Sequence, residues 1–358
     1  MDRDMQRVGL MRQLLAAQGY DGVVVRAPAN VLLLSGYLPR GGDSYCLFKQ
    51  SGEVTLVVPE DEAERAAGGW ADRVLTFSRF VDGYVQAASE GALPHLRELL
   101  GQYDRLSKLG YENGPQPVAA YGPEAGIPDG GSGDVLKVAG HGATWYDCTD
   151  LTETGALWKT VREMAAVRRA GEVAVAGLTA AREIHAPNVP PGVIAGAALG
   201  AMAASAFEYE DVLPFCRVLG GEATIVAVRV AVNGFWASAT RTFGGEAKVQ
   251  AEYELSLMAR AAAIAAVENG ALGSEIDAAA RAVFVAAGND GPSWTGHGVG
   301  FHAESPLARP MISPGSIDSV RPNMAFTLAA GPASVLVEDS IGFTSRGVEI
   351  LTDFPHAL

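Results

Sequence analysis

Two side chains suited to proton transfer lie near the carboxyl-terminal end of the sequence. His297 lies in the glycine-rich string GHGVG (296–300), and Glu338 lies in the string LVEDS (336–340). An imidazole that no metal holds can act as a general acid or base near neutral pH, and the glycines beside it leave room for a bound molecule. We predict that His297 moves a proton and that Glu338 orients the imidazole or a water. The alternatives are a histidine satisfied by a backbone carbonyl and a glutamate held in a salt bridge.

The hydrophobic pattern predicts that these residues lie in the second of two α/β domains. Its first helix begins at 161, because Thr160 followed by Glu163 forms a capping-box signal. Ser274 followed by Asp277 gives a similar signal for a later helix. Helices are predicted at 161–184, 192–207, 250–268 and 274–287, and strands at 224–232, 234–243, 325–330 and 334–343.

The first half of the chain alternates helix and strand signals that are typical of a compact domain with a mixed sheet. Residues 114–133 are rich in glycine and proline, which predicts an irregular loop. The fold class is therefore α/β (α+β), with domains at 1–150 and 151–358. Strands are predicted at 22–26, 45–48, 54–58 and 109–112, with a helix at 92–100.

Composition and charge exclude several classes of protein. The chain of 358 residues has 41 acidic and 27 basic side chains, a formal charge of −14, which disfavours nucleic-acid binding. The three cysteines are far apart and form no CxxC pair, so we expect buried thiols, no disulfide and a reducing compartment. No signal peptide is visible, and the uncharged run 186–207 contains prolines and is too short to span a bilayer. We expect a cytoplasmic protein that binds neither nucleic acid nor membrane.

Four segments in order along the chain resemble the creatinase/prolidase/methionine aminopeptidase family, which has the pita-bread fold. APANVLLLSGY (27–37) resembles the family's amino-terminal domain, and NGFWASATRTF (233–243) resembles a strand in which an aspartate precedes the Thr-Arg pair. GHGVG (296–300) resembles the metal-histidine loop, and LVEDSIGFTSRGVEILT (336–352) resembles the last strands. The resemblance implies a creatinase-type domain at 1–150 and a pita-bread domain at 151–358.

The resemblance also implies where five metal ligands of the peptidases would lie, and most are replaced. Family peptidases hold two metal ions with two aspartates, one histidine and two glutamates, and the metals activate a water. The corresponding positions here are Ala227, Ser238, His297, Ala329 and Glu338. The additional catalytic histidine of the family has no match either, and its loop is shortened to LGGEAT (219–224). We expect neither a catalytic metal nor another cofactor.

Arg229 is the most suggestive substitution near these positions. It follows Ala227 by two residues, so both side chains face the same side of a strand. A guanidinium there could bind a substrate carboxylate bidentately or stabilise a developing oxyanion. The alternative is a structural ion pair with Glu338 or Asp339.

Further residues are expected to contact substrate because of the positions they occupy in the resemblance. His302 or Glu304 takes the place of a substrate-facing histidine, and Arg241 belongs to the TRTF segment, where an arginine is more often structural. In creatinase-like dimers a loop of the partner's first domain covers the site. The matching loop in this sequence is GYLPRGGDSY (36–45). A homodimer is therefore expected, although an ordinary exposed loop is the alternative. The expected substrate-binding residues are His302, Glu304, Arg241, Ser238, Arg40 and Tyr45.

These residues lead to one preferred function and two alternatives. The preferred function is a metal-independent enzyme that hydrolyses a C–N bond in a small amino-acid-like molecule, as creatinase does, with His297 as acid and base, Glu338 as its partner and Arg229 on the anionic group. A lyase or cyclase of specialised metabolism could use the same pocket without water. A catalytically inactive pseudo-peptidase used for binding is the third hypothesis, and the retained polar residues argue against it.

Overall fold

The computed structural model describes residues 2–40, 44–113, 132–221, 223–289, 291–301, 308–332 and 334–355. The chain forms two compact units, Met1–Ala156 and Leu157–Leu358. The sequence placed the division at 150/151, which lies inside helix α6 (Thr149–Leu157) at the end of the first unit. Most of the segment 114–133, expected to be irregular, lies outside the described residues.

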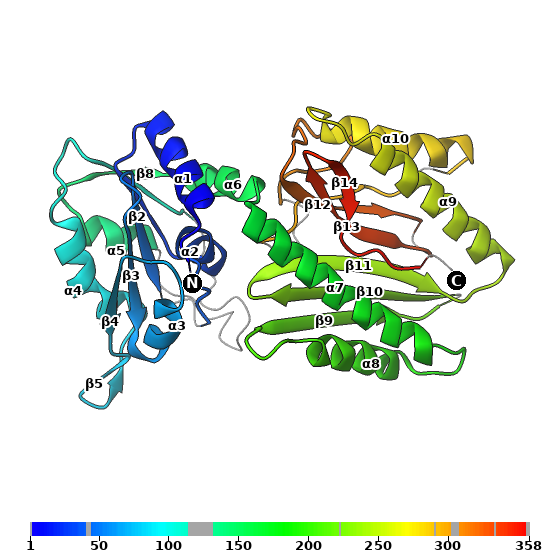
Figure 1. The fold of residues 1–358 in the computed structure, drawn as a ribbon, viewed down its shortest axis with the longest axis horizontal. Coiled ribbons are helices and arrows are strands. Elements are labelled where there is room, and N and C mark those ends of the chain that lie inside the picture. The colour runs from blue at the N-terminus through cyan, green and yellow to red at the C-terminus, as the bar shows by residue number, and fades with distance from the viewer. Residues whose placement is uncertain are drawn as a thin grey trace. The chain divides into compact units, whose positions relative to one another are not determined.

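The first unit is a mixed sheet with helices on both faces (Figure 1). Its strand order is β4-β3-β2-β1-β7-β8, antiparallel along β3-β2-β1 and parallel elsewhere, as the sequence predicted for a mixed sheet. The strands are β1 (Gly22–Val25), β2 (Tyr45–Lys49), β3 (Val54–Pro59), β4 (Arg73–Phe77), β7 (Lys108–Tyr111) and β8 (Thr144–Asp147), with a small hairpin of β5 (Phe80–Val81) and β6 (Tyr84–Val85). The helices are α1 (Met5–Gln18), α2 (Pro28–Ser35), α3 (Ala63–Ala67), α4 (Ala88–Leu100) and α5 (Ser132–Ala139), with a short 3₁₀ turn at Glu60–Glu62.

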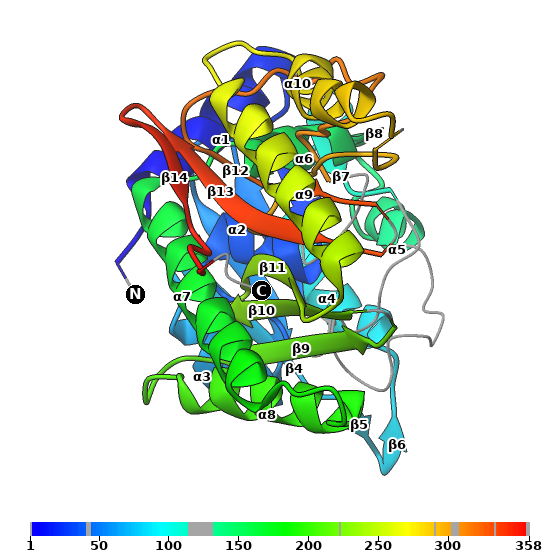
Figure 2. The same cartoon turned by 90° about the vertical axis from the view of Figure 1, so that its right-hand side faces the viewer.

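The second unit is an antiparallel sheet of order β12-β13-β11-β10-β9, with β14 paired to β13. Figure 2 shows the helices crossing the strands. The strands are β9 (Val212–Leu219), β10 (Thr224–Val232), β11 (Phe235–Phe243), β12 (Met324–Ala330), β13 (Val337–Thr344) and β14 (Gly347–Ile350). The helices are α7 (Val161–Ile184), α8 (Pro191–Ala204), α9 (Ala247–Ala265) and α10 (Gly273–Ala286). This arrangement confirms the predicted pita-bread domain.

Alternating residues of the second sheet pack against these helices. Val226, Val228 and Val230 of β10 pack against α7 and α8, and Phe326 and Leu328 of β12 pack against α9 and α10. Successive strand residues point to opposite faces, so the residues between these apolar ones face the other way. We call that other face the site face. It bears Ala227, Arg229, Ser238, Thr240, Ala329 and Glu338.

Two capping signals were predicted for helices of the second unit, and the structure confirms one of them. Thr160 and Glu163 form the predicted capping box, because each side chain accepts a hydrogen bond from the other's backbone nitrogen, at 2.9 and 3.3 Å. The signal at Ser274 and Asp277 was wrong. Helix α10 begins at Gly273, and the Asp277 carboxylate instead accepts a hydrogen bond from Thr295 Oγ1 at 2.6 Å.

Helix α8 covers most of the uncharged run 186–207, which the sequence predicts to be too short to span a membrane. It begins at Pro191, where a proline at the first helical position lacks only an N–H that would have no helical partner. Ile194, Ala198 and Met202 form its buried stripe against α7 and the sheet. Within the described ranges, no helix is long and apolar enough to cross a membrane.

Candidate active site

The strand register brings three of the five positions implied for metal ligands into one row of the site face. Ala227 of β10 lies opposite Thr240 of β11, Thr240 lies opposite Glu338 of β13, and Glu338 lies opposite Ala329 of β12. Ser238 lies two residues from Thr240, on the same face. The alignment inferred from short motifs therefore places these residues together on adjacent strands.

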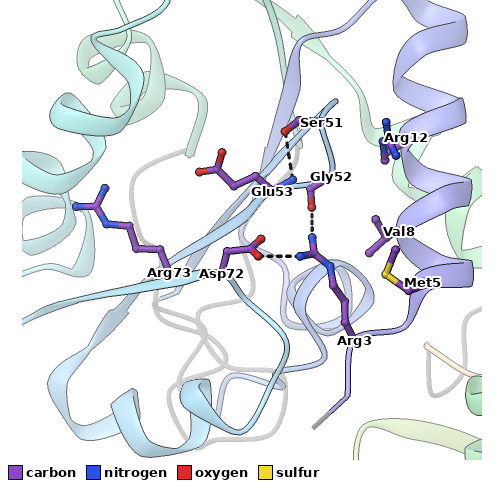
Figure 3. Close-up of a pocket in the computed structure, with 9 residues that line it drawn as sticks. All are labelled: Arg3, Met5, Val8, Arg12, Ser51, Gly52, Glu53, Asp72 and Arg73. Carbon is purple, nitrogen blue, oxygen red and sulfur yellow. Dashed lines mark hydrogen bonds and ion pairs between the residues drawn. The ribbon is translucent and has the colours of Figure 1, made fainter.

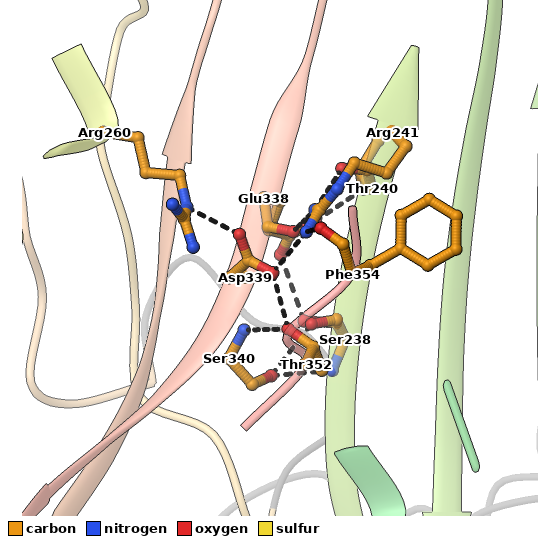
Figure 4. A network of polar contacts seen from close by, with 9 residues as sticks. All are labelled: Ser238, Thr240, Arg241, Arg260, Glu338, Asp339, Ser340, Thr352 and Phe354. Carbon is orange, nitrogen blue, oxygen red and sulfur yellow. Dashed lines mark hydrogen bonds and ion pairs between the residues drawn. The ribbon is translucent and has the colours of Figure 1, made fainter. Parts of the chain in front are cut away.

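Glu338 is buried and held by two hydroxyl groups of β11 (Figure 4). Ser238 Oγ donates to Glu338 Oε1 at 3.0 Å, and Thr240 Oγ1 donates to Oε2 at 2.7 Å. Hydrogen bonds to a charged acceptor are stronger than neutral ones, so the two hydroxyls fix the orientation of the carboxylate. Each carboxylate oxygen can accept a second hydrogen bond, which leaves Glu338 able to bind a water or a ligand N–H.

His297 lies beside β12, on the side away from β13. Its backbone carbonyl accepts a hydrogen bond from Thr327 N at 2.8 Å, and the neighbouring Gly298 forms a bridge with Phe326. The imidazole is fully buried, and its Nδ1 lies 2.9 Å from the carbonyl oxygen of Gly298. This contact places a proton on Nδ1, so in the neutral imidazole the lone pair is on Nε2. Nε2 has no hydrogen-bond partner among the described residues.

Arg241 lies on the opposite face of β11 from Ser238 and Thr240. Its Nη2 pairs with Asp339 Oδ1 at 2.7 Å, and its Nη1 donates to the backbone carbonyl of Glu338 at 2.8 Å. Arg260 of α9 pairs with the other oxygen of Asp339 at 2.6 Å. These side chains are buried in the helix-covered side of the sheet, so the structure corrects the expected substrate contact of Arg241 to a structural role (Figure 4).

The other predicted site residues lie on the site face, in the first unit, or outside the described residues. Arg229 faces the site side and lies directly opposite Ser238. Tyr45 begins β2 and is buried in the first unit, with the Arg26 guanidinium over its ring, so the expected contact with substrate is wrong. Arg40 is exposed, with its backbone nitrogen bonded to Glu62. His302 and Glu304 lie outside the described residues.

Two residues of this region were missed by sequence reasoning. Thr240 was read only as part of the TRTF string, although the period-two alternation of a strand places it on the same face as Ser238. Arg217 lies on β9, directly opposite Ala227. No local signal could have found Arg217, because its position depends on the register between two strands.

The residues at these positions do not fit a dinuclear metal centre. Only His297 and Glu338 remain as ligand types, and both oxygens of Glu338 already accept hydrogen bonds from hydroxyl groups. Over the ranges that the structure describes, no three His, Cys, Asp or Glu side chains lie close enough together to hold a metal ion. A dinuclear site needs several carboxylates to offset the charge of two cations.

A separate pocket of about 610 Å³ lies on the first unit (Figure 3). Its charged groups already have partners: Arg3 pairs with Asp72 at 2.7 Å and also donates to the carbonyl of Gly52. Arg12 donates to the backbone carbonyl of Gln50 at 3.0 Å. The pocket contains none of the residues predicted to do chemistry, and its partnered side chains give no reason to assign a function to it.

Comparison with known families agrees with this architecture. Residues 7–121 match the family model of the creatinase/prolidase N-terminal domain, and residues 214–350 match that of metallopeptidase family M24. An α/β domain followed by a pita-bread domain defines a peptidase-like protein. The chain belongs to the creatinase/prolidase family.

Individual relatives are similar over different lengths. The chain is 28% identical over 148 residues to the protein named "Putative dipeptidase YkvY" of Bacillus subtilis; the match covers 38% of this chain and 40% of that relative. The prolidase of Pyrococcus horikoshii OT3 has the same fold, with a TM-score of 0.76 and 20% identity over 98% of this chain and 99% of that one. The Xaa-Pro dipeptidase of Bacillus anthracis gives a TM-score of 0.73 and 18% identity over 99% of each chain.

Proposed function

We propose that the protein is a metal-independent enzyme that hydrolyses a C–N bond in a small amino-acid-like molecule. The observation that carries the proposal is the state of His297, whose buried Nε2 lacks a partner within the described chain while Nδ1 is fixed by Gly298. Leaving a buried polar atom unsatisfied costs about 1–3 kcal/mol. A histidine that served only the fold would gain nothing from this arrangement, whereas a general base needs it.

The proposed reaction uses the site face without a metal ion. Nε2 of His297 takes a proton from water as the water oxygen bonds to the electrophilic carbon. The same imidazolium then gives its proton to the leaving nitrogen as the C–N bond breaks, which returns the histidine to its starting state. Glu338, oriented by Ser238 and Thr240, accepts a hydrogen bond from the water or the substrate. Arg229 stabilises negative charge that develops on substrate oxygen.

The donor set supports the metal-independent part of the proposal. Ala227 and Ala329 offer no ligand atom, and the Ser238 hydroxyl donates to Glu338. The family relatives are described as peptidases and dipeptidases, which supports hydrolysis as the reaction class. The retained row of polar side chains on a fold otherwise rich in alanine supports a working site over an inactive one.

A substrate screen tests this proposal. The protein, dialysed against EDTA, is incubated with a panel of dipeptides and of guanidino- and ureido-substituted amino acids, and the products are identified by mass spectrometry. We expect one compound to gain the mass of one water and to split at a C–N bond. Loss or rearrangement without added water would replace hydrolysis by elimination or cyclisation. Turnover that requires added transition metal would refute the metal-independent mechanism.

The expected homodimer belongs to the same proposal. Arg40 lies in the loop that covers the partner's site in creatinase-like dimers, and its side chain is exposed in this chain. We expect Arg40→Gln to weaken substrate binding without changing the mass measured by light scattering. A monomer with full activity would remove Arg40 from the site.

A further inference from the structure

Two arginines flank the position of the first missing carboxylate. Arg217 of β9 lies directly opposite Ala227, and Arg229 follows Ala227 by two residues on β10. Directly opposite residues of antiparallel strands have their Cβ atoms about 5 Å apart, and residues two apart on one strand are separated by about 7 Å. All three side chains leave the same face of the sheet, so both guanidinium groups can reach the space above the alanine.

The residues that replace the carboxylates leave room for an anion on this part of the site face. The positions that hold carboxylates in the metallopeptidases hold Ala227, Ser238 and Ala329 here, so Glu338 is the one carboxylate that remains among them. The nearby Asp339 faces the other side of the sheet and pairs with Arg241 and Arg260. Arg217 is exposed and makes no ion pair or hydrogen bond with any other described residue. Arg217 therefore contributes one positive charge that no described carboxylate offsets, on a chain of net charge −14.

An aromatic surface lies next to the arginine pair. Phe215 of β9 lies directly opposite Arg229 and is 47% exposed. Its ring stacks on that of Trp236 with the centroids 5.7 Å apart and the planes 27° apart. Leu219, two residues beyond Arg217 on the same face of β9, is also exposed. The anion site therefore has an apolar side that a charged group alone would not use.

We propose that Arg217 and Arg229 form a carboxylate-binding subsite and that Phe215 contacts an apolar or planar group of the same ligand. The ligand class is a small carboxylate with such a group close to the charge, for example an N-acylated amino acid. This inference rests on the proposed function only in taking that ligand to be the substrate. Arginine suits the role because its planar fork can hold both oxygens of a carboxylate.

Calorimetric titration with defined probes tests the subsite. N-benzoylglycine is titrated into the wild-type protein at constant ionic strength, with the uncharged benzamide and inorganic phosphate in parallel. We expect N-benzoylglycine to bind and benzamide to bind at least about tenfold more weakly, since each charged contact contributes about that factor. Arg217→Gln and Arg229→Gln are each expected to weaken binding of N-benzoylglycine about tenfold, and Phe215→Ala to weaken it less.

Matched variants separate this subsite from general charge effects. Arg346 lies exposed in the turn between β13 and β14, so Arg346→Gln removes one positive charge from the same unit and should leave binding unchanged. Arg217 is on the surface, so its substitution leaves the fold intact, and circular dichroism checks Arg229→Gln. Equal affinity for wild type and both arginine variants would overturn the proposal. The proposal would also be overturned if N-benzoylglycine did not bind. It would be overturned as well if phosphate bound through the same arginines and N-benzoylglycine did not.

The two proposals fail in different ways. A His297→Leu variant keeps both arginines, so it should bind N-benzoylglycine as the wild type does even where turnover is lost. Binding through the arginines without turnover of any screened compound would leave the subsite and remove the proposed enzyme activity. Metal-free turnover with no effect of either arginine substitution would leave the enzyme and remove the subsite.

Discussion

Glu338 and Asp339 are consecutive residues of β13, and their carboxylates serve opposite faces of one sheet. Glu338 accepts hydrogen bonds from two hydroxyl groups on the site face, whereas Asp339 pairs with two arginines on the helix-covered face (Figure 4). The alternation of a β-strand separates the two environments completely. Substitutions at these neighbours should therefore have different consequences.

Asp339→Asn should destabilise the protein strongly. Removing one partner of a buried ion pair leaves charge uncompensated and costs about 3–5 kcal/mol. Here Arg241 and Arg260 would both lose their counter-charge. Urea denaturation followed by circular dichroism measures the loss. The matched control is Glu338→Gln, which keeps the shape and one acceptor oxygen, so it should cost no more than one hydrogen bond to a charged group, about 1.5–3 kcal/mol. Equal destabilisation by both would contradict the assigned roles.

The Thr240 hydroxyl should stabilise the fold through Glu338. Thr240→Val keeps the shape but removes a hydrogen bond of 2.7 Å to a carboxylate, worth about 1.5–3 kcal/mol. In a Glu338→Leu background the same substitution should cost far less, because its acceptor is gone. A double-mutant cycle in urea measures this coupling. A cost of Thr240→Val that is the same in both backgrounds would show that the hydroxyl acts elsewhere.

His297→Leu should separate stability from activity. The substitution removes Nε2, which has no partner within the described chain, and also the Nδ1 hydrogen bond to Gly298. Because these two effects oppose each other, the free energy of unfolding should stay within about 1 kcal/mol of wild type. Turnover of the substrate found in the screen should be lost. Thermal denaturation and product formation are measured on the same preparation. A large loss of stability would make His297 a structural residue.

Cysteine labelling should show that no thiol is activated. Burial raises the pKa of the half-buried Cys216 to about 11 and raises the pKa values of Cys46 and Cys148 further. The thiolate is the reactive form, so at pH 8 only about 0.1% of Cys216 is reactive. Alkylation of native protein at pH 8 should be about 100-fold slower than in urea. The rate at Cys216 should rise about tenfold per pH unit up to pH 10. Rapid labelling at pH 8 would instead indicate a nucleophilic cysteine.

Much of the fold could be predicted because local patterns and tertiary packing agree. Alternating valines of 224–232 pack against α7 and α8, so the strand signal and the buried face coincide in β10. The start of α7 was also predicted correctly, because the capping box of Thr160 and Glu163 forms in the structure as the sequence indicates. Strand β9 was not predicted, and its run contains Pro214, which argues against a central strand. A proline is tolerated at the edge of a sheet, where one side of the strand is unpaired.

The site was harder to predict than the fold, because contacts depend on facing and register. Ser238, His297 and Glu338 were found from short motifs. Arg241 was expected near substrate because it belongs to the TRTF segment, yet it points to the face of β11 opposite that of Ser238 and Thr240. Tyr45 was expected both to begin a strand and to contact substrate. It does begin β2, but its side chain is buried in the first unit.

Elemental analysis tests the central claim, metal independence, most directly. Protein purified without chelators and then dialysed is analysed for manganese, iron, cobalt, nickel and zinc by mass spectrometry, beside a sample dialysed against EDTA. We expect well under one equivalent of metal per chain in both samples and equal turnover, because Ala227, Ser238 and Ala329 supply no metal-binding carboxylate. Two tightly held equivalents of transition metal, with turnover lost on their removal, would contradict the account.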